Sequence, residues 1–561
     1  MTMVWSPDYL GSPGKMVLSN PLTCTNTPKG ENKLYSDAKG VVPSLDLRFA
    51  EGKNLNDYMT GTPLVDHQRS MNSSTFSPGT FVNSNGLIET AKANYALYSE
   101  TLTASWWSGG QFISISDTTD VNPPTGIQNI YKVTETADTG EHFFRGSQVN
   151  LAVTAGVPNG TVVTISIYLN TSLGRSKVRV YSFGQNNLTF IWDLVNNAQI
   201  GTISGGTSPT INSQSLGNNW YRFSFTDTAT TSSNFRPVFQ TVNNLNQFNY
   251  AGDTTKGFYA SGFQVEIGTT ATTYIPTTTS ASAAPRFDHN PTTGESLGLL
   301  IEESRTNILL NSATLSTQSV TTSATAYTLS FYGTGTVTLS GTSTAGPLAG
   351  TGANDRVTLT FTPTAGTLTL TVTGTVSNAQ LEAGSFPTSY IPTTGTALTR
   401  SADDVSISGS NFSSWYNQSE GTVFAESKVQ DFTATNFPRI ASLDRGDGSA
   451  NFAAIVRSSA INKVEYSVFA GTGQAVGLQP PSTFTSGSSF RAAGIYKVDD
   501  FIAAANGTLS PVDTTGSVPT SLTTLGIGMQ GNGTLHYNGT IRRLTYFPDR
   551  LEDSVLQAIT Q

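Results

Sequence analysis

Adjacent carboxylates are the first residues in this chain that could do chemistry. Glu302 is followed by Glu303, and Asp403 by Asp404. Two carboxyl groups about 5 to 9.5 Å apart can serve as the two acids of a glycoside hydrolase. Neighbouring residues on a strand point to opposite faces, so neither pair suits this role, and Arg305 near Glu303 predicts an ion pair instead. The sequence therefore names no catalytic residue.

Aromatic side chains offer a second kind of chemistry, because the C–H face of a sugar ring packs on a flat apolar ring. Trp106, Trp107 and Tyr168 are candidate carbohydrate-binding platforms. Burial in a core or an interface is the competing interpretation. We favour it because consecutive Trp106 and Trp107 face opposite sides of any strand. Trp220, in the strand-like segment NNWYRF, is expected in a core.

The run DRGDG, Asp444 to Gly448, contains an Arg-Gly-Asp tripeptide. Asp-Gly is common in hairpin turns, so a turn is the favoured interpretation. Calcium binding by Asp444 and Asp447 is the alternative, but calcium needs more oxygen ligands than the motif supplies. Four scattered histidines and the single Cys24 provide no zinc or disulfide motif. We expect no metal and no cofactor.

Short β-strands are the elements expected to position these residues. The chain has 561 residues, of which 53 are Gly and only 12% are charged, while 37% are hydrophobic. Such a composition favours many strands joined by turns over long helices, and its hydrophobic share argues against disorder. The length predicts several domains.

Charge and hydropathy limit the partners. The net charge of −8 and the lack of any basic run argue against nucleic-acid binding. No apolar run of 18 residues occurs, so membrane insertion is not expected. The first residues lack a signal-peptide pattern, which predicts assembly in the host cytoplasm and release by lysis.

One sequence segment occurs twice in the chain. Gln380 to Thr396 and Gln264 to Ser280 share 9 of 17 positions, and the openings NYALYSETL at Asn94 and NILLNSATL at Asn307 also match. Repetition of this kind indicates a repeated structural unit. We infer two sandwich modules with the same opening and closing segments.

The strand patterns divide the chain into six regions. They are an extended N-terminal arm (1–43), a connector (44–93), a jelly roll (94–284), a second connector (285–304), a smaller β-sandwich (305–400) and a C-terminal sandwich (401–561). In TISIYL, alternation places Ile165, Ile167 and Leu169 in a core. The last residues predict a helix capped by Asp549, with an apolar stripe of Leu551, Val555, Leu556 and Ile559.

Three blocks resemble the framework of a family of tailed-bacteriophage virion structural proteins of the fibre, spike or decoration type. They are SLDLRFAEGKNLNDYMTGTPL (44–64), FVNSNGLIETAKAN (81–94) and RFDHNPTTGESLGLLIEESRTNILLNS (286–312). In that family the second block runs almost directly into the third, so residues 94–284 look like an insertion. The insertion resembles carbohydrate-binding jelly rolls. Residues 421–547, with RAAGIYKVDD and YNGTIRRL, resemble concanavalin/laminin-G-like sandwiches.

The strand patterns and this resemblance together predict an all-β, multidomain array of antiparallel sandwiches, and the lack of a plausible acid pair predicts no enzymatic activity. The expected role is that of a tail fibre, spike or capsid decoration, with host-surface glycan as a target. A tail-associated polysaccharide depolymerase and a purely architectural virion protein are the alternatives. Other virion proteins are expected to bind the arm, and low-charge sandwiches of this kind favour a homotrimer. We expect the arm at the particle and residues 401–561 at the distal end.

Overall fold

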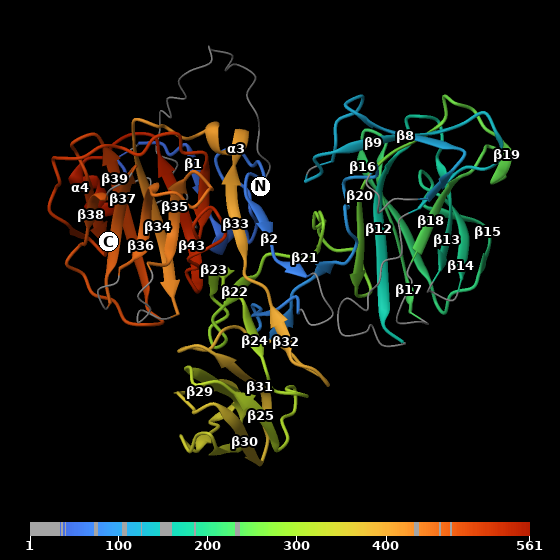
Figure 1. Cartoon of the computed structure of the whole chain (residues 1–561). Coiled ribbons are helices and arrows are strands. Elements are labelled where there is room, and N and C mark those ends of the chain that lie inside the picture. The colour runs from blue at the N-terminus through green and yellow to red at the C-terminus, as the bar shows by residue number, and fades with distance from the viewer. Residues whose placement is uncertain are drawn as a thin grey trace, which may run out of the picture.

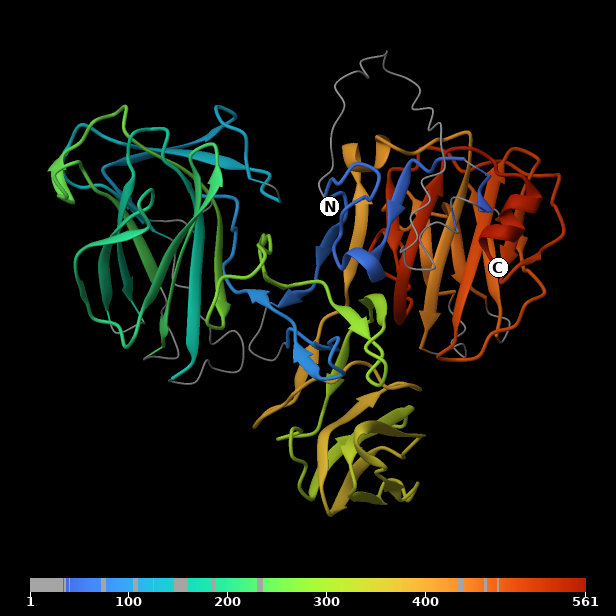
Figure 2. The same cartoon turned by 180° about the vertical axis from the view of Figure 1, so that it is seen from behind.

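The computed structural model describes residues 34, 37–39, 41–71, 77–103, 109–124, 126–145, 160–183, 187–229, 236–430, 437–458, 462–471 and 474–561. Within these residues the chain is all-β: antiparallel strands form three sandwiches, which Figures 1 and 2 show as separate lobes that meet at short central strands. Most of the predicted arm, residues 1–43, lies outside the described residues.

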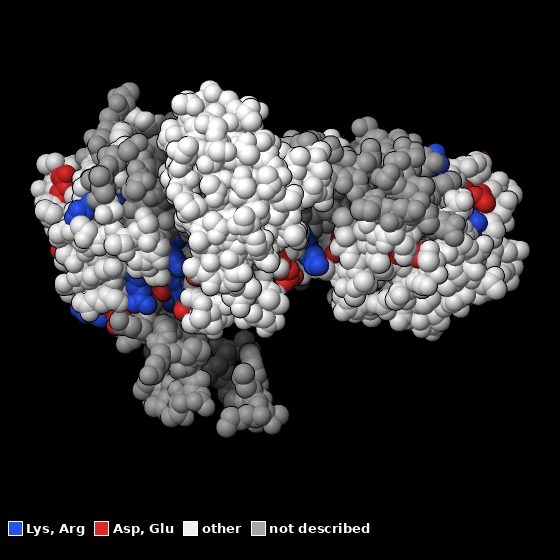
Figure 3. All heavy atoms as spheres, turned by 90° about the horizontal axis from the view of Figure 1, so that it is seen from below, with Lys and Arg blue, Asp and Glu red and all other residues white. Residues whose placement is uncertain are grey.

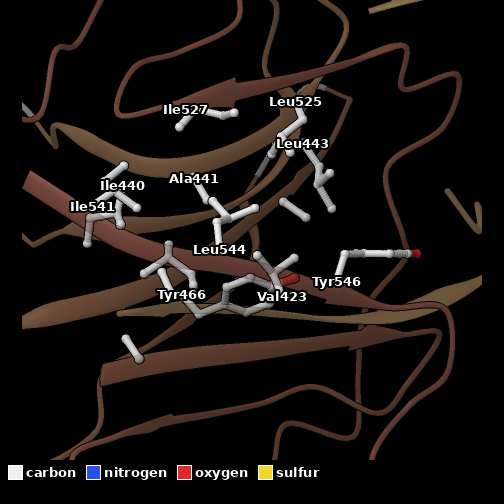
Figure 4. Close-up of a cluster of buried hydrophobic side chains, with 14 of the residues drawn as sticks. Val423, Ile440, Ala441, Leu443, Tyr466, Leu525, Ile527, Ile541, Leu544 and Tyr546 are labelled. Atoms are coloured by element: carbon white, nitrogen blue, oxygen red, sulfur yellow. The ribbon is translucent and has the colours of Figure 1, made fainter. Parts of the chain in front are cut away.

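The largest sandwich contains the C-terminal region. One described sheet comprises β1 (Leu45–Leu47), β22 (Phe287–His289), β23 (Ser296–Ile301), β34 (Glu420–Val429), β39 (Ser489–Lys497), β40 (Ile502–Ala505), β41 (Thr508–Leu509) and β43 (Gly539–Phe547). The other comprises β2 (Asp66–Gln68), β33 (Asp404–Ser408), β35 (Arg439–Asp444), β36 (Asn451–Arg457), β37 (Val464–Ala470), β38 (Gln474–Leu478) and β42 (Thr524–Ile527). Apolar side chains from both sheets meet between them (Figure 4).

The segments expected to be connectors are part of this sandwich. Strand β1 pairs with β43, β2 pairs with β33, and β23 pairs with β43. Leu45 and Ile301 are fully buried in the same core as Leu544. Residues 45–68 and 287–301 therefore contribute strands to the C-terminal sandwich, which is built from three separate stretches of sequence.

Three short helices occur among the described residues: α2 (Phe49–Gly52), α3 (Gly409–Ser413) and α4 (Asp553–Ile559). Helix α4 covers one sheet of the C-terminal sandwich through the predicted stripe of Leu551, Val555, Leu556 and Ile559. The predicted cap is wrong. Glu552 occupies the N-cap position without a side-chain bond, and the backbone carbonyl of Asp549 instead accepts a hydrogen bond from Thr422.

The jelly roll consists of two described sheets. The first comprises β7 (Gly109–Gln111), β11 (Phe143–Arg145), β13 (Lys177–Phe183), β14 (Leu188–Asp193), β15 (Ala198–Ser204) and β18 (Arg236–Thr241). The second comprises β8 (Ile113–Thr118), β9 (Ile130–Glu135), β12 (Val162–Asn170), β16 (Thr210–Gly217), β17 (Trp220–Thr228) and β20 (Gly257–Ile267). A short ribbon joins β10 (Thr139–Glu141) to β19 (Asn249–Ala251). Ile165, Ile167 and Leu169 lie in the core, as predicted.

The small sandwich also has two described sheets. They are β25 (Gln318–Thr322), β30 (Gly366–Thr373), β27 (Thr336–Gly341) and β28 (Leu348–Ala349), and β29 (Gly352–Phe361), β26 (Tyr327–Gly333) and β31 (Val376–Ala383). From below, this lobe presents a surface without charged side chains (Figure 3). The sequence explains this, because 306–354 and 357–381 contain no Lys, Arg, Asp or Glu.

Each smaller module is attached through paired strands. The jelly roll leaves through β6 (Ala93–Asn94) and returns through β21 (Ala281–Ala283), which pair with each other beside β3 (Ser70–Met71). The small sandwich leaves through β24 (Arg305–Asn307) and returns through β32 (Leu398–Arg400), which also pair. A separate hairpin joins β4 (Thr80–Val82) to β5 (Ile88–Thr90). Both modules are thus insertions whose two ends lie side by side.

The repeated sequence segments form the same clasp in both modules. Asn94 and Asn307 each donate to two backbone carbonyls and accept from two backbone amides. The partners are Phe263, Ile275, Ala96 and Val265 for Asn94, and Ala379, Ile391, Leu309 and Leu381 for Asn307. The clasp ties the opening segment of each module to its closing segment.

A tyrosine–serine contact completes each clasp. The hydroxyl of Tyr274 lies 2.5 Å from that of Ser99, and the hydroxyl of Tyr390 lies 2.8 Å from that of Ser312. The four residues come from the repeated sequences. The repeat is therefore a structural device that closes a module at its stem.

Candidate functional site

Two carboxylates considered for catalysis lie buried where the modules meet. Glu302 directly follows β23 and is 5% exposed, and Asp403 directly precedes β33 and is fully buried. The amide of Glu302 donates to Asp403 Oδ2 at 3.0 Å, and the amide of Asp403 donates to the carbonyl of Glu302 at 3.0 Å. The ends of these two strands are thereby fixed together.

Three arginines surround these carboxylates, and all three are fully buried. Arg69 Nη1 lies 2.5 Å from Asp403 Oδ1. Arg286 bridges the two acids, with Nη2 2.7 Å from Asp403 Oδ2 and Nη1 2.7 Å from Glu302 Oε2. Arg400 Nη1 lies 2.9 Å from Glu302 Oε2. We call Arg69, Arg286, Glu302, Arg400 and Asp403 the junction cluster.

The junction cluster holds its carboxylates ionised. Burial alone would raise the pKa of Glu302, but Arg400 and Arg286 outweigh it and lower the pKa to about 2. Burial opposes ionisation of Asp403 as well, yet Arg286 and Arg69 hold its pKa well below the ordinary value. His67 contacts Asp403 at 3.4 Å, and burial lowers its pKa, so the ring is neutral.

This arrangement does not suit acid catalysis. A general acid needs a raised pKa and access to substrate, whereas these two carboxylates are buried, ionised and paired. Glu303 and Asp404, the neighbours of these two carboxylates in sequence, lie outside the junction cluster. Glu303 is partly exposed and pairs with Arg305 at 2.5 Å, as predicted, and Asp404 is exposed on β33.

Asp288 is a further carboxylate close to the junction cluster. It accepts a hydrogen bond from the amide of Val82 at 2.7 Å, and it lines a cavity of about 120 Å³ with Glu302 and Arg356. Burial raises the pKa of Asp288 to about 6, and the nearby charge of Glu302 adds to this effect. The cavity is too small for a sugar chain.

The predicted aromatic platforms are only partly placed. Trp106 and Trp107 lie outside the described residues, directly before β7 in sequence. Tyr168 is 7% exposed and packs with Ile130 and Trp220, so its ring is not an open platform. Trp220 is buried as predicted, and its indole donates to the carbonyl of Asn122 at 2.8 Å.

The DRGDG run is a turn. Asp444 is buried, with Oδ1 accepting from the amide of Gly446 at 2.8 Å and Oδ2 from that of Gly531 at 2.9 Å. Asp447 is turned to solvent, where its Oδ1 accepts from the amide of Ser449 at 2.9 Å.

Within the described part of the chain, no three His, Cys, Asp or Glu side chains gather as a metal site would require. The described helices are likewise too short or too polar to cross a membrane.

The outward face of the β7–β11–β18–β13–β14–β15 sheet carries polar and aromatic groups that the sequence did not single out. Arg179 donates a hydrogen bond to Gln240, and Gln240 Nε2 in turn donates to Glu141 at 2.9 Å. The guanidinium of Arg179 lies 4.0 Å from the centre of the Phe248 ring. Tyr181 follows on the same strand and face. Half-exposed rings beside guanidinium and carboxylate groups suit polar ligands such as glycans.

Register places Phe143 and Arg145 on this same face. Phe143 pairs with Gln240, and Arg145 pairs with Val238. We call Phe143, Arg145, Arg179, Tyr181 and Phe248 the jelly-roll face. A signal for it existed in the sequence, because SKVRVYSF alternates apolar residues with Arg179 and Tyr181.

Comparisons with known proteins give only distant similarities. No protein-family model and no curated protein matches the chain. Among solved structures, it is similar to the CBM40 domain of the IT-sialidase of Ruminococcus gnavus bound to α2,3-sialyllactose (19% identity, 26% of this chain, 83% of that chain, TM-score 0.23). It is also similar to the NanB sialidase of Streptococcus pneumoniae (13% identity, 27% of this chain, 26% of that chain, TM-score 0.24). A third similar structure is domain 4 of AbnA, a GH43 arabinanase of Geobacillus stearothermophilus, in complex with arabinotriose (10% identity, 28% of this chain, 73% of that chain, TM-score 0.23). Identities and scores this low carry no conclusion about fold, ligand or activity.

Proposed function

We propose that this chain is a non-enzymatic structural protein of a tailed-phage virion. In this role it displays lectin-like β-sandwich modules, as a tail fibre, a spike or a capsid decoration, and contacts host-surface glycan. The role follows from the resemblance of residues 44–64, 81–94 and 286–312 to phage framework blocks. The observation that carries it is the bridge of Arg286 to Glu302 and Asp403.

That bridge supports a display function because it joins distant framework segments at one buried point. Arg286 follows the jelly-roll insertion, Glu302 precedes the small sandwich, and Asp403 follows it. Breaking such a buried pair is costly, so the bridge favours one fixed arrangement of the framework segments at the bases of the inserted modules. A depolymerase would instead need two accessible carboxylates, whereas Glu302 and Asp403 are buried in ion pairs with arginines.

The described end of the arm leads us to propose the opposite polarity to the expected one. Leu34 and Ala38 pack against the α4 side of the C-terminal sandwich, and Lys39 Nζ lies 3.2 Å from Glu552. An arm attached to a particle would therefore hold the C-terminal sandwich near that particle. In our proposal the two inserted modules face outward, and residues 401–561 are proximal rather than distal.

Glycan contact is assigned in this proposal to the jelly-roll face rather than to Tyr168. The face combines two cations with half-exposed aromatic rings. A purely architectural protein remains the second candidate, favoured by the uncharged surface of the small sandwich. Glycan retention by the wild-type chain, lost in Tyr181→Ala, would separate the two. Association into a homotrimer stays a prediction, tested by light scattering.

The test of the virion role uses particles of a phage that encodes this sequence. Quantitative mass spectrometry should find the chain in purified particles, and a chain lacking residues 2–33 should fold but be absent from them. The truncation spares Leu34 and Ala38, so the sandwich keeps its packing. Recovery of the full chain only in the particle-free fraction would contradict the proposal.

A further inference from the structure

A second polar site lies in the seam between the small sandwich and the C-terminal sandwich. A cavity of about 250 Å³ there is lined by Glu303, Arg305, Phe386, Leu535, His536 and Asn538, among others. A neighbouring cavity of about 470 Å³ shares Glu303, Arg305 and Gly384 with it. The two cavities thus adjoin at the Arg305–Glu303 pair. We call them together the seam site.

Arg305 is held in place across the seam site. Its Nε donates to Glu303 Oε1 at 2.7 Å, and its guanidinium lies 4.9 Å from the Phe386 ring centre. Gly384 is required for this arrangement, because a Cβ at that position would overlap Nη1 of Arg305. A single charged side chain is therefore fixed where the two sandwiches meet. Acidic and basic side chains are visible along this boundary in Figure 3.

Asn538 and His536 each bring one unused polar atom to the seam site. Asn538 is 8% exposed, and its Oδ1 accepts from the amide of Glu303 at 2.8 Å, which leaves Nδ2 without an acceptor among the described residues. His536 Nε2 must donate to the carbonyl of Asp403, 3.0 Å away. Burial lowers the pKa of His536, so the ring is neutral and Nδ1 is an acceptor that no described residue uses.

Glu303 and Arg305 also have spare capacity. The bonds between them use Glu303 Oε1 with Nε and Nη2 of Arg305, so Oε2 and Nη1 have no other partner in the described structure. These four residues offer donors at Asn538 Nδ2 and Arg305 Nη1 and acceptors at His536 Nδ1 and Glu303 Oε2, and the buried Arg457 adds a second cation to the lining. Leu535 and Phe386 supply apolar surface beside them.

The presence of both donors and acceptors in the seam site selects the ligand class. A hydroxyl group both donates and accepts, so a ring with several hydroxyls can satisfy all four atoms. A fully ionised phosphate or carboxylate has no hydrogen to donate to His536 Nδ1 or Glu303 Oε2, and a hydrocarbon would leave the polar atoms unpaired. The volume suits a small ring. We propose that the seam site binds a neutral saccharide unit, independently of the jelly-roll face.

The test is ligand-observed NMR on the full chain with methyl glycosides of glucose, galactose and N-acetylglucosamine. Glucuronate and inorganic phosphate serve as anionic probes. At least one neutral glycoside should bind, and Asn538→Asp and Arg305→Lys should each weaken that binding about three- to tenfold, as expected for one or two lost hydrogen bonds. Arg542→Lys is the matched control, because Arg542 pairs with Glu295 on the surface of the same sandwich.

A measurement on the unmodified chain keeps the proposal testable if the variants fail to fold. The chain has only four histidines, so isotope labelling of histidine gives four resolvable rings. The neutral glycoside should shift the His536 signal and leave those of His67, His142 and His289 in place. The proposal is overturned by absence of neutral-glycoside binding, by tighter binding of glucuronate or phosphate, or by a bound glycoside that leaves the His536 signal unmoved. Loss of binding in Tyr181→Ala alone would place the sugar on the jelly-roll face and overturn it too.

Discussion

Arg286 and Asp403 are 117 residues apart in sequence, and their side chains lie 2.7 Å apart in a fully buried ion pair. The small sandwich occupies most of the intervening chain. The pair thus closes the base of an inserted module and joins it to the sandwich that carries it.

Asp403→Ala should destabilise the protein strongly. The change leaves Arg69 and Arg286 buried without their carboxylate, and removal of one partner of a buried pair costs about 3–5 kcal/mol. Chemical denaturation monitored by tryptophan fluorescence would measure this loss. Asp404→Ala, at the exposed neighbouring position, is the control and should cost less than about 0.5 kcal/mol. Equal stability of the two variants would contradict the role of the junction cluster.

Asn94→Ala and Asn307→Ala should each weaken one module and spare the other. Each removes a buried amide that makes four hydrogen bonds, and the unpaired backbone groups left behind should cost about 3 kcal/mol or more. Hydrogen exchange should become faster in the jelly roll for Asn94→Ala and in the small sandwich for Asn307→Ala. Uniform acceleration across the chain would show that the clasps do not act module by module.

Asp288→Asn should stabilise the protein more at pH 8 than at pH 5. The folded-state pKa of Asp288 is raised to about 6, so its ionised form is disfavoured in the fold. The stability this group contributes is present at low pH and is lost as pH rises from about 4 to about 6. The asparagine removes that loss and can still accept from Val82. The difference in unfolding free energy between the two pH values should be about 1 kcal/mol, and a variant equally stabilised at both would refute the assignment.

Excision of the jelly roll should leave a folded protein. The paired positions Asn94 and Ser282 lie on adjacent antiparallel strands, so a short glycine turn can replace residues 95–280. The remaining chain should unfold cooperatively and retain the near-ultraviolet spectrum of the C-terminal sandwich. Aggregation, or loss of that spectrum, would mean that the module is needed for the fold that carries it.

Local sequence patterns predicted much of this fold, because alternation is a local property. Ile165, Ile167 and Leu169 lie in a core as expected, and so does the apolar stripe of α4. The Asp549 cap was wrong because the helix begins only at Asp553. The pairing of β1 and β23 with β43 was missed, since no local pattern identifies a partner hundreds of residues away.

The site was harder to predict than the fold. Glu302 and Asp403 were recognised as chemically notable, but their partners Arg69, Arg286 and Arg400 come from separate stretches that meet only in the folded chain. Isolated arginines at strand ends are a usable signal in a sequence with so few charges. Tyr168 could not be placed by alternation alone, because both faces of β12 are covered.

The central claim is that the framework carboxylates hold the structure together and do not catalyse. Its most direct test is to incubate the wild-type chain with bacterial capsule polysaccharide and lipopolysaccharide and to measure new reducing ends. The account predicts no release above that of a heat-unfolded control. Release of reducing ends by the wild-type chain that is abolished by Glu302→Gln, in a variant that remains folded, would contradict it.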